Sequence, residues 1–170
     1  EFINSISIEA SEILTSKLSE TEKVSKLKMI AEESVDIDGV GLYTLGKYRK
    51  TLTNEQKEEY KKLFREYFLK SFSGRLVVYN DAKIAVISEE VKNEKYTIVY
   101  SKLIGTTDRP EVKIDWRVYT KDPENPLIRD LVIEGLSLAR TQKEEFNSII
   151  ANNGGNIEAL FENLNKFLEN

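Results

Sequence analysis

The sequence contains neither cysteine nor histidine. The usual zinc ligands are therefore missing, as are the commonest general base and the thiol nucleophile. Four serines that might otherwise suggest a nucleophile have no histidine to activate them: Ser71, Ser73, Ser101 and Ser137. The composition thus predicts no metal centre and no catalytic set, and the protein is not expected to be an enzyme.

Long apolar runs and segregated charge are also missing. No stretch approaches the roughly 20 apolar residues that a membrane-spanning helix needs. The net charge is −4, and lysines are interspersed with glutamates, so nucleic acid is not expected as a partner. The chain has 170 residues, of which 40% are hydrophobic, and this is enough to build a core. We therefore predict a single domain over residues 1–170.

Capping motifs and apolar residues at helical spacing predict helices at both ends of the chain. Ser19 with Glu22, and Thr53 with Gln56, are spaced as capping boxes, which open helices. The predicted helices are an N-terminal one up to Leu18, a second opened by Ser19, a short one at 42–48 after two glycines, an aromatic-rich one at 55–72, one that follows Gly135, and a last one from Ile157.

The hydrophobic period changes to two in the middle of the chain, where Val, Ile and Tyr are frequent. Turn residues at Asn80-Asp81 and Asn93-Glu94 make the connections short, which favours an antiparallel meander because parallel strands need long crossovers. The predicted strands cover residues 76–79, 83–91, 95–104, 111–119 and 127–134. Because helices and strands are segregated, we predict an α+β fold with helices packed on one face of an antiparallel sheet of four or five strands.

The strand at 111–119 is amphipathic, with apolar residues alternating with Lys113, Asp115 and Arg117. Strand side chains point to opposite faces in turn, so the charged set is expected to face solvent. The residues expected to point inward are Val112, Ile114, Trp116 and Val118. The helix at 55–72 presents an aromatic stripe that includes Phe64, Phe68 and Phe72. Periodicity leaves two interpretations of these residues open, an ordinary core and the lining of a cavity between helix and sheet.

The acidic residues give little reason to predict catalysis. Asp36 and Asp38 do not have the spacing of an EF-hand or a phosphate-binding loop, so helix capping and turn formation are the better interpretation. Asp115 and Glu134 could form an acid/base pair only if they faced a cleft. Alternation places Asp115 opposite Trp116, so we expect it to face solvent.

Two stretches carry motifs whose order and spacing are those of a known family. The first contains DIDGVG at 36–41, LGKYRKT at 45–51, LFREYF at 63–68 and GRL at 74–76, followed by Tyr79. The second contains VIEGLSL at 132–138, TQ at 141–142, EF at 145–146 and NGG at 153–155. Together they cover about half of the chain, and they resemble the MlaC family, also called the toluene-tolerance or auxiliary components of a lipid ABC transporter.

The resemblance implies a fold and a function. It implies a curved sheet wrapped by helices, as in nuclear-transport-factor-like proteins, with an apolar cavity for phospholipid acyl chains and the headgroup outside. It also implies a soluble periplasmic carrier without cofactors. Such a carrier shuttles lipid between an outer-membrane lipoprotein–porin complex and an inner-membrane ABC transporter that bears a ring of MCE domains. No signal peptide is visible before Glu1, and we expect one to have been removed.

The resemblance and the apolar pattern together select candidate lipid-binding residues: Leu45, Phe64, Phe68, Phe72, Val112, Ile114, Trp116, Val118, Leu138 and Phe146. Two alternatives remain open at this point. One is a small-molecule enzyme on a cone-shaped α+β fold, which would need Asp115 or Glu134 deep in a cavity with a raised pKa. The other is an interaction module that binds no lipid and has a filled core.

Overall fold

Side-chain caps set where most of the helices begin in the computed structural model, which describes residues 1–77 and 83–170. Both predicted capping boxes are present: Ser19 opens α2 (Glu20–Ser34) and Thr53 opens α4 (Asn54–Leu76). Asn156 caps the last helix, whose predicted start is also confirmed. The other helices are α1 (Phe2–Thr15), α3 (Ile37–Leu45), the 3-10 helix η1 (Gly46–Lys50), α5 (Leu138–Ala151) and α6 (Ile157–Glu169).

Two of the predicted elements differ from the structure. The short helix expected at 42–48 begins earlier, because the carboxylate of Asp36 accepts a hydrogen bond from the amide of Gly39 (3.1 Å) and thereby starts α3. The strand expected at 76–79 is wrong at its start, since Leu76 ends α4 and Val77 caps it. The remainder of that strand, and the turn predicted at Asn80-Asp81, lie outside the described residues.

The strands form a single antiparallel meander, as predicted. Their order in the sheet is β1 (Ile84–Val91), β2 (Tyr96–Leu103), β3 (Val112–Tyr119), β4 (Leu127–Ile133) and β5 (Leu136–Ser137). The two-residue strand β5 was not predicted. It exists because Glu134 and Gly135 both adopt positive φ (50° and 84°), a tight turn that returns Leu136 to pair with Ile133.

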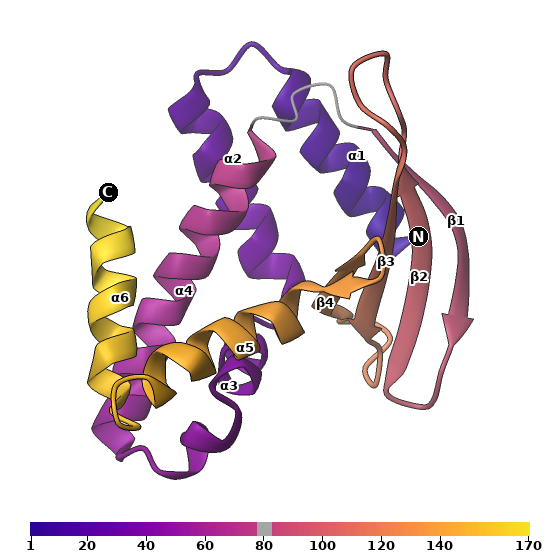
Figure 1. Ribbon diagram of the computed structural model, residues 1–170. Coiled ribbons are helices and arrows are strands. Elements are labelled where there is room, and N and C mark those ends of the chain that lie inside the picture. The colour runs from indigo at the N-terminus through magenta and orange to yellow at the C-terminus, as the bar shows by residue number, and fades with distance from the viewer. Residues whose placement is uncertain (78–82) are drawn as a thin grey trace.

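The sheet and most of the helices form two separate parts of the molecule (Figure 1). α1 packs against β1 on the inner side of the sheet, while α2, α3 and α5 reach the sheet at β4. α4 packs against α2, α3 and α6 in the helical part. This arrangement confirms the predicted α+β class. In the part of the chain that the structure describes, no helix is both long and apolar enough to cross a membrane.

Candidate functional site

The hydrophobic residues gather in two clusters, one in each part of the molecule. The helical cluster is built from α2, α3, α4, α5 and α6 and includes the stacked rings of Tyr60 and Phe64, whose centroids are 5.8 Å apart. The sheet cluster is built on the inner faces of β2, β3 and β4, together with Ile3 of α1. Val35, directly after α2, packs against both clusters. The two apolar surfaces therefore meet at the end of α2.

The sequence-predicted residues divide between these clusters. Leu45, Phe64 and Phe146 are buried in the helical cluster, and Phe68 and Phe72 are half-buried against it. In β3 the predicted orientation is confirmed. The residues buried or half-buried on its inner face are Val112, Ile114, Trp116 and Val118. Leu138, the first residue of α5, is half-buried and belongs to neither cluster.

Both clusters have half-buried members that protein atoms cover only in part. In the helical cluster Phe68 and Phe72 lie against each other with their rings nearly parallel, at 5.8 Å between centroids. In the sheet cluster, several half-buried residues were not among the predicted lipid-binding residues. They are Phe2, Ile6, Ile84, Val86, Leu103, Leu131 and Ile133. The alternation of apolar and polar residues in β4 could have identified those that lie on that strand.

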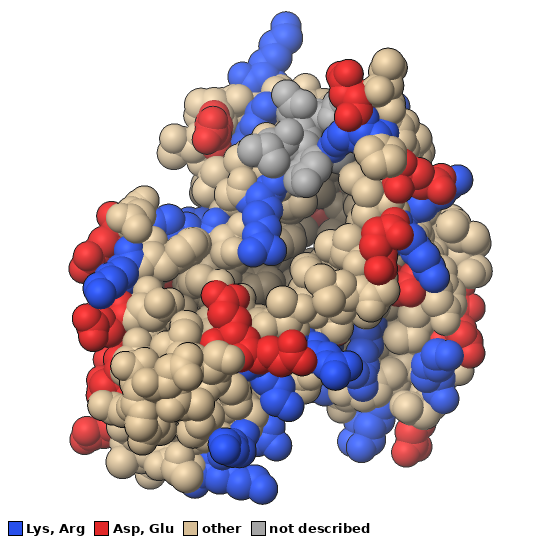
Figure 2. All heavy atoms as spheres, in the orientation of Figure 1, with Lys and Arg blue, Asp and Glu red and all other residues tan. Residues whose placement is uncertain are grey.

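The visible face of the molecule is hollowed between the helical part and the sheet (Figure 2). Uncharged residues predominate inside this hollow, whereas Lys, Arg, Asp and Glu crowd the outer rims. A concave surface of this composition suits a ligand that is largely apolar.

Polar groups within the two clusters are satisfied by one another. The Trp116 indole donates to Ser101 Oγ (2.8 Å), and Ser101 donates in turn to the carbonyl of Ile114 (2.8 Å). Tyr60 and Thr44 share a hydrogen bond of 2.7 Å between their hydroxyls. Burial raises the pKa of the Tyr60 phenol, so it stays neutral at any physiological pH. These hydrogen bonds pair the buried polar groups, so that none of them is left unsatisfied beside an apolar surface.

Comparison with known proteins identifies the family. The model of the family described as "MlaC protein" matches residues 5–166, which is nearly the whole chain. The chain belongs to the MlaC family. The fold of these 170 residues is also that of a phospholipid-binding protein from Ralstonia solanacearum, solved in complex with a phospholipid. The two structures superpose with a TM-score of 0.80 at 18% identity, over 99% of this chain and 95% of the other.

The two stretches that resemble MlaC motifs both contact β4. From the first stretch, the Asp36 carboxylate accepts from Arg129 Nε (2.9 Å), and Arg129 also donates to the Tyr96 hydroxyl (2.7 Å). The backbone amide of Asp36 donates to the carbonyl of Ile128 (3.0 Å). Asp36 therefore both caps α3 and fixes it to the sheet, which confirms capping as its role.

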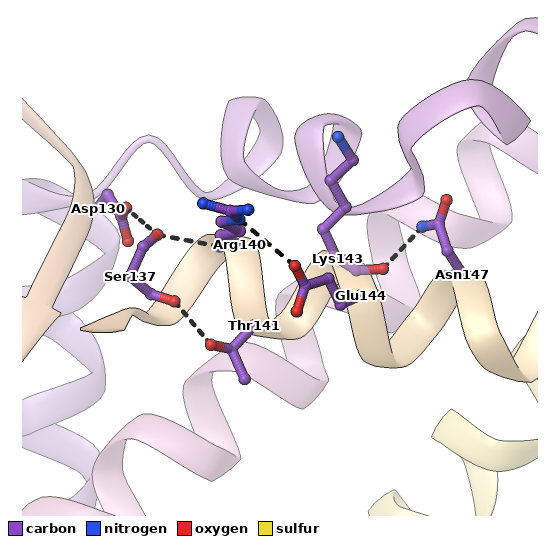
Figure 3. Close-up of polar contacts among 7 residues, drawn as sticks. All are labelled: Asp130, Ser137, Arg140, Thr141, Lys143, Glu144 and Asn147. Carbon is purple, nitrogen blue, oxygen red and sulfur yellow. Dashed lines mark hydrogen bonds and ion pairs between the residues drawn. The ribbon is translucent and has the colours of Figure 1, made fainter. Parts of the chain in front are cut away.

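From the second stretch, Ser137 donates to Asp130 of β4 at the start of α5 (Figure 3). Asp130 also accepts from the amide of Ala139 (3.0 Å), where a negative charge is favourable at a helix N-terminus. Further along α5, Asn147 donates to the carbonyls of Lys143 and, in α3, Thr44. Asp36 and Ser137, one from each stretch, thus hold α3 and α5 to β4, and Asn147, which is not itself a motif residue, joins α5 to α3.

The carboxylates considered for catalysis lie elsewhere. Glu134 is exposed, and its side chain accepts from the amide of Lys113 (2.6 Å). Asp115 lies on the outer face of β3, as predicted, but it is not freely exposed: 20% of its side chain is accessible. Its cross-strand neighbours Tyr100 and Val132 cover it, which sequence alternation alone could not show. No group of three or more Asp or Glu residues among those described could hold a metal ion.

Proposed function

We propose that this protein is a phospholipid carrier, working as one lipid-binding domain over residues 1–170. The acyl chains would lie in the hollow between the helices and the inner face of the sheet, with the headgroup outside. The observation that carries this proposal is the pair of apolar clusters, each with half-buried members, that meet at Val35. A domain with a filled core has no need of two incompletely covered apolar surfaces beside a hollow.

The half-buried residues are the proposed lipid contacts. Phe68, Phe72, Val112 and Leu138 retain surface that acyl chains could cover. The buried members of the predicted set support them from beneath: Leu45, Phe64, Ile114, Trp116, Val118 and Phe146. Each methylene moved from water into such surroundings contributes about 0.8 kcal/mol, so two acyl chains would be held firmly in transit.

The comparisons support the choice of ligand. The structure from Ralstonia solanacearum contains a phospholipid, and its fold matches 99% of this chain. As a member of the MlaC family, the protein would work in the periplasm. There it would accept and deliver lipid at an outer-membrane lipoprotein–porin complex and at an inner-membrane ABC transporter with its MCE-domain ring. The carrier requires no catalysis and no cofactor, because lipid enters and leaves unchanged.

Native mass spectrometry of the purified protein tests this function. We expect a phospholipid adduct with little headgroup selectivity, because the proposed contacts are to acyl chains. Organic extraction should then recover the same lipid. If no phospholipid is recovered, and the protein also fails to bind phospholipid added from vesicles, the carrier function is wrong.

A further inference from the structure

One segment of this acidic protein has only positive charge. The chain contains 29 Asp and Glu residues against 25 Lys and Arg, yet residues 39–53 include no carboxylate. The same segment contains Lys47, Arg49 and Lys50, all within η1. Their side chains are exposed. A cluster of positive charges on a chain of negative net charge creates a local positive potential, which attracts negatively charged partners.

A cation from α5 joins this segment. The Lys143 side chain crosses Gly46, where an added Cβ would lie 3.0 Å from Lys143 Cε. Its ammonium lies over the ring of Tyr43, 5.1 Å from the centroid. We call Lys47, Arg49, Lys50 and Lys143 the basic end. Lys and Arg side chains gather along the lower edge of the face in Figure 2, at the end of the molecule where Figure 1 places α3.

The charge of the basic end is not neutralised within the protein. Some cations elsewhere are paired, as Arg140 is with Glu144 (3.4 Å, Figure 3) and Arg129 with Asp36. Within residues 1–77 and 83–170, no carboxylate lies within ion-pairing distance of any of the four cations. Their charges are therefore available to an external anion.

Apolar side chains adjoin these cations. Leu42 and Tyr43 on α3 are 36% and 41% exposed, large values for hydrophobic residues within a folded helix. Lys47 also lies over an aromatic ring, that of Tyr48, at 5.3 Å from the centroid. Cations next to exposed Leu and Tyr are typical of surfaces that rest on a bilayer, where the rings enter the headgroup region and the charges meet lipid phosphates.

We propose that the basic end docks the protein transiently on the surface of a bilayer that contains anionic phospholipid. The site is distinct from the hollow, and the inference goes beyond lipid carriage itself. Three of its four cations are lysines, which protein–protein interfaces tend to exclude and anionic bilayers attract. Four cations with little apolar area give weak, reversible attachment, which a carrier that must leave the membrane needs.

Vesicle co-sedimentation tests the proposal, with phosphatidylcholine vesicles prepared with and without phosphatidylglycerol. We expect binding only to the anionic vesicles and weaker binding at high salt. The variant K47Q/R49Q/K50Q should bind on the order of 100-fold more weakly, from roughly fivefold for each cation near an anionic surface. The control K17Q/K26Q/K83Q removes three exposed cations outside the basic end, with the same change of net charge, and should bind like the wild type.

The outcomes separate this site from the lipid cavity. Equal binding to both kinds of vesicle, or equal losses in the two triple variants, would overturn the proposal. So would a K47Q/R49Q/K50Q protein that binds anionic vesicles normally and fails only to exchange lipid with a protein partner. Native mass spectrometry of the same variants reports lipid loading. Unloaded protein that still binds anionic vesicles would contradict the carrier function and leave the docking site standing.

Discussion

Phe64 and Phe68 are one helical turn apart on α4, yet their surroundings differ. Phe64 is 2% exposed and contacts Phe146 edge-on at 6.4 Å between centroids. Phe68 is half-buried and lies between Phe64 and Phe72. The first residue thus belongs to the core, and the second retains exposed surface, which the proposed ligand would cover.

We predict that Phe68→Glu folds but loads roughly tenfold less phospholipid, because an unpaired carboxylate beside acyl chains is costly. Lipid bound per protein is measured by native mass spectrometry, with circular dichroism to verify folding. Phe68→Leu is the matched control, since it keeps an apolar side chain, and it should load lipid normally. A folded Phe68→Glu protein with normal loading would show that this face of α4 does not contact lipid.

Helix packing depends on glycine at one position and not at another. A Cβ on Gly41 would lie 2.8 Å from Phe64 Cδ1, so α3 can approach α4 only without a side chain there. At Gly74, in the last turn of α4, an added Cβ would have no atom within 4 Å. The two glycines therefore permit a matched comparison within one pair of helices.

We predict that Gly41→Ala lowers the free energy of unfolding by about 1–3 kcal/mol, the usual cost of overpacking. Gly74→Ala should raise it by roughly 0.5–1 kcal/mol, because alanine is the better helix former and meets no atom. Urea denaturation followed by circular dichroism measures both. Equal changes in the two variants would mean that α3 shifts freely to admit the methyl group.

The strand β3 permits a test of which sheet face meets the lipid. Ile114 is buried on the inner face, and Asp115 faces outward next to it. A photo-crosslinking side chain is longer than isoleucine and from position 114 would reach lipid that covers the half-buried Val112 on the same face. We predict that position 114 forms phospholipid adducts, detected by mass spectrometry, and that position 115 does not. The opposite pattern would assign the pocket to the outer face of the sheet.

Elements determined by local sequence were predictable. The capping boxes at Ser19 and Thr53 and the alternation in β3 depend on neighbouring residues, and all three were confirmed. The start of α3 was missed, although its cap at Asp36 is local, because Gly39 and Gly41 near its start are poor helix formers. β5 was missed because two residues are too few to show a period.

The candidate site was predictable only in part, because the burial of its residues depends on contacts between elements that are far apart in the sequence. The sequence identified Phe64 and Phe68 as one stripe, but their difference in burial depends on tertiary contacts such as that of Phe146 of α5 with Phe64. Asp115 was expected in solvent, yet its cover comes from residues of two other strands. Burial of this kind arises from tertiary packing, which periodicity does not encode.

At the scale of the whole molecule, the helical part and the sheet are joined along β4. Arg129 and Asp130 hold the helices there, and Val35 lies between the two apolar clusters. A lipid in the hollow would touch both parts and add an apolar connection between them. Lipid binding is therefore expected to stabilise the fold as a unit.

We predict that removing bound lipid lowers the melting temperature. A ligand at about a hundredfold excess over its Kd stabilises the folded state by about 2.7 kcal/mol. For a domain of this size that corresponds to roughly 5–10 °C in Tm. Differential scanning calorimetry of the protein before and after delipidation measures the change, and readdition of phospholipid should restore it. An unchanged Tm would indicate that lipid does not connect the two parts.

The meander also has a consequence for the order of folding. Neighbours in the sheet are neighbours along the chain, so each of its strands is added by closing a short loop. The Asp36–Arg129 pair, in contrast, joins residues 93 positions apart. Because local contacts form faster than distant ones, we expect hairpins and helices to appear early and the joint at β4 to form last. The newly made chain would thus pass through a stage in which both apolar surfaces exist but have not yet come together.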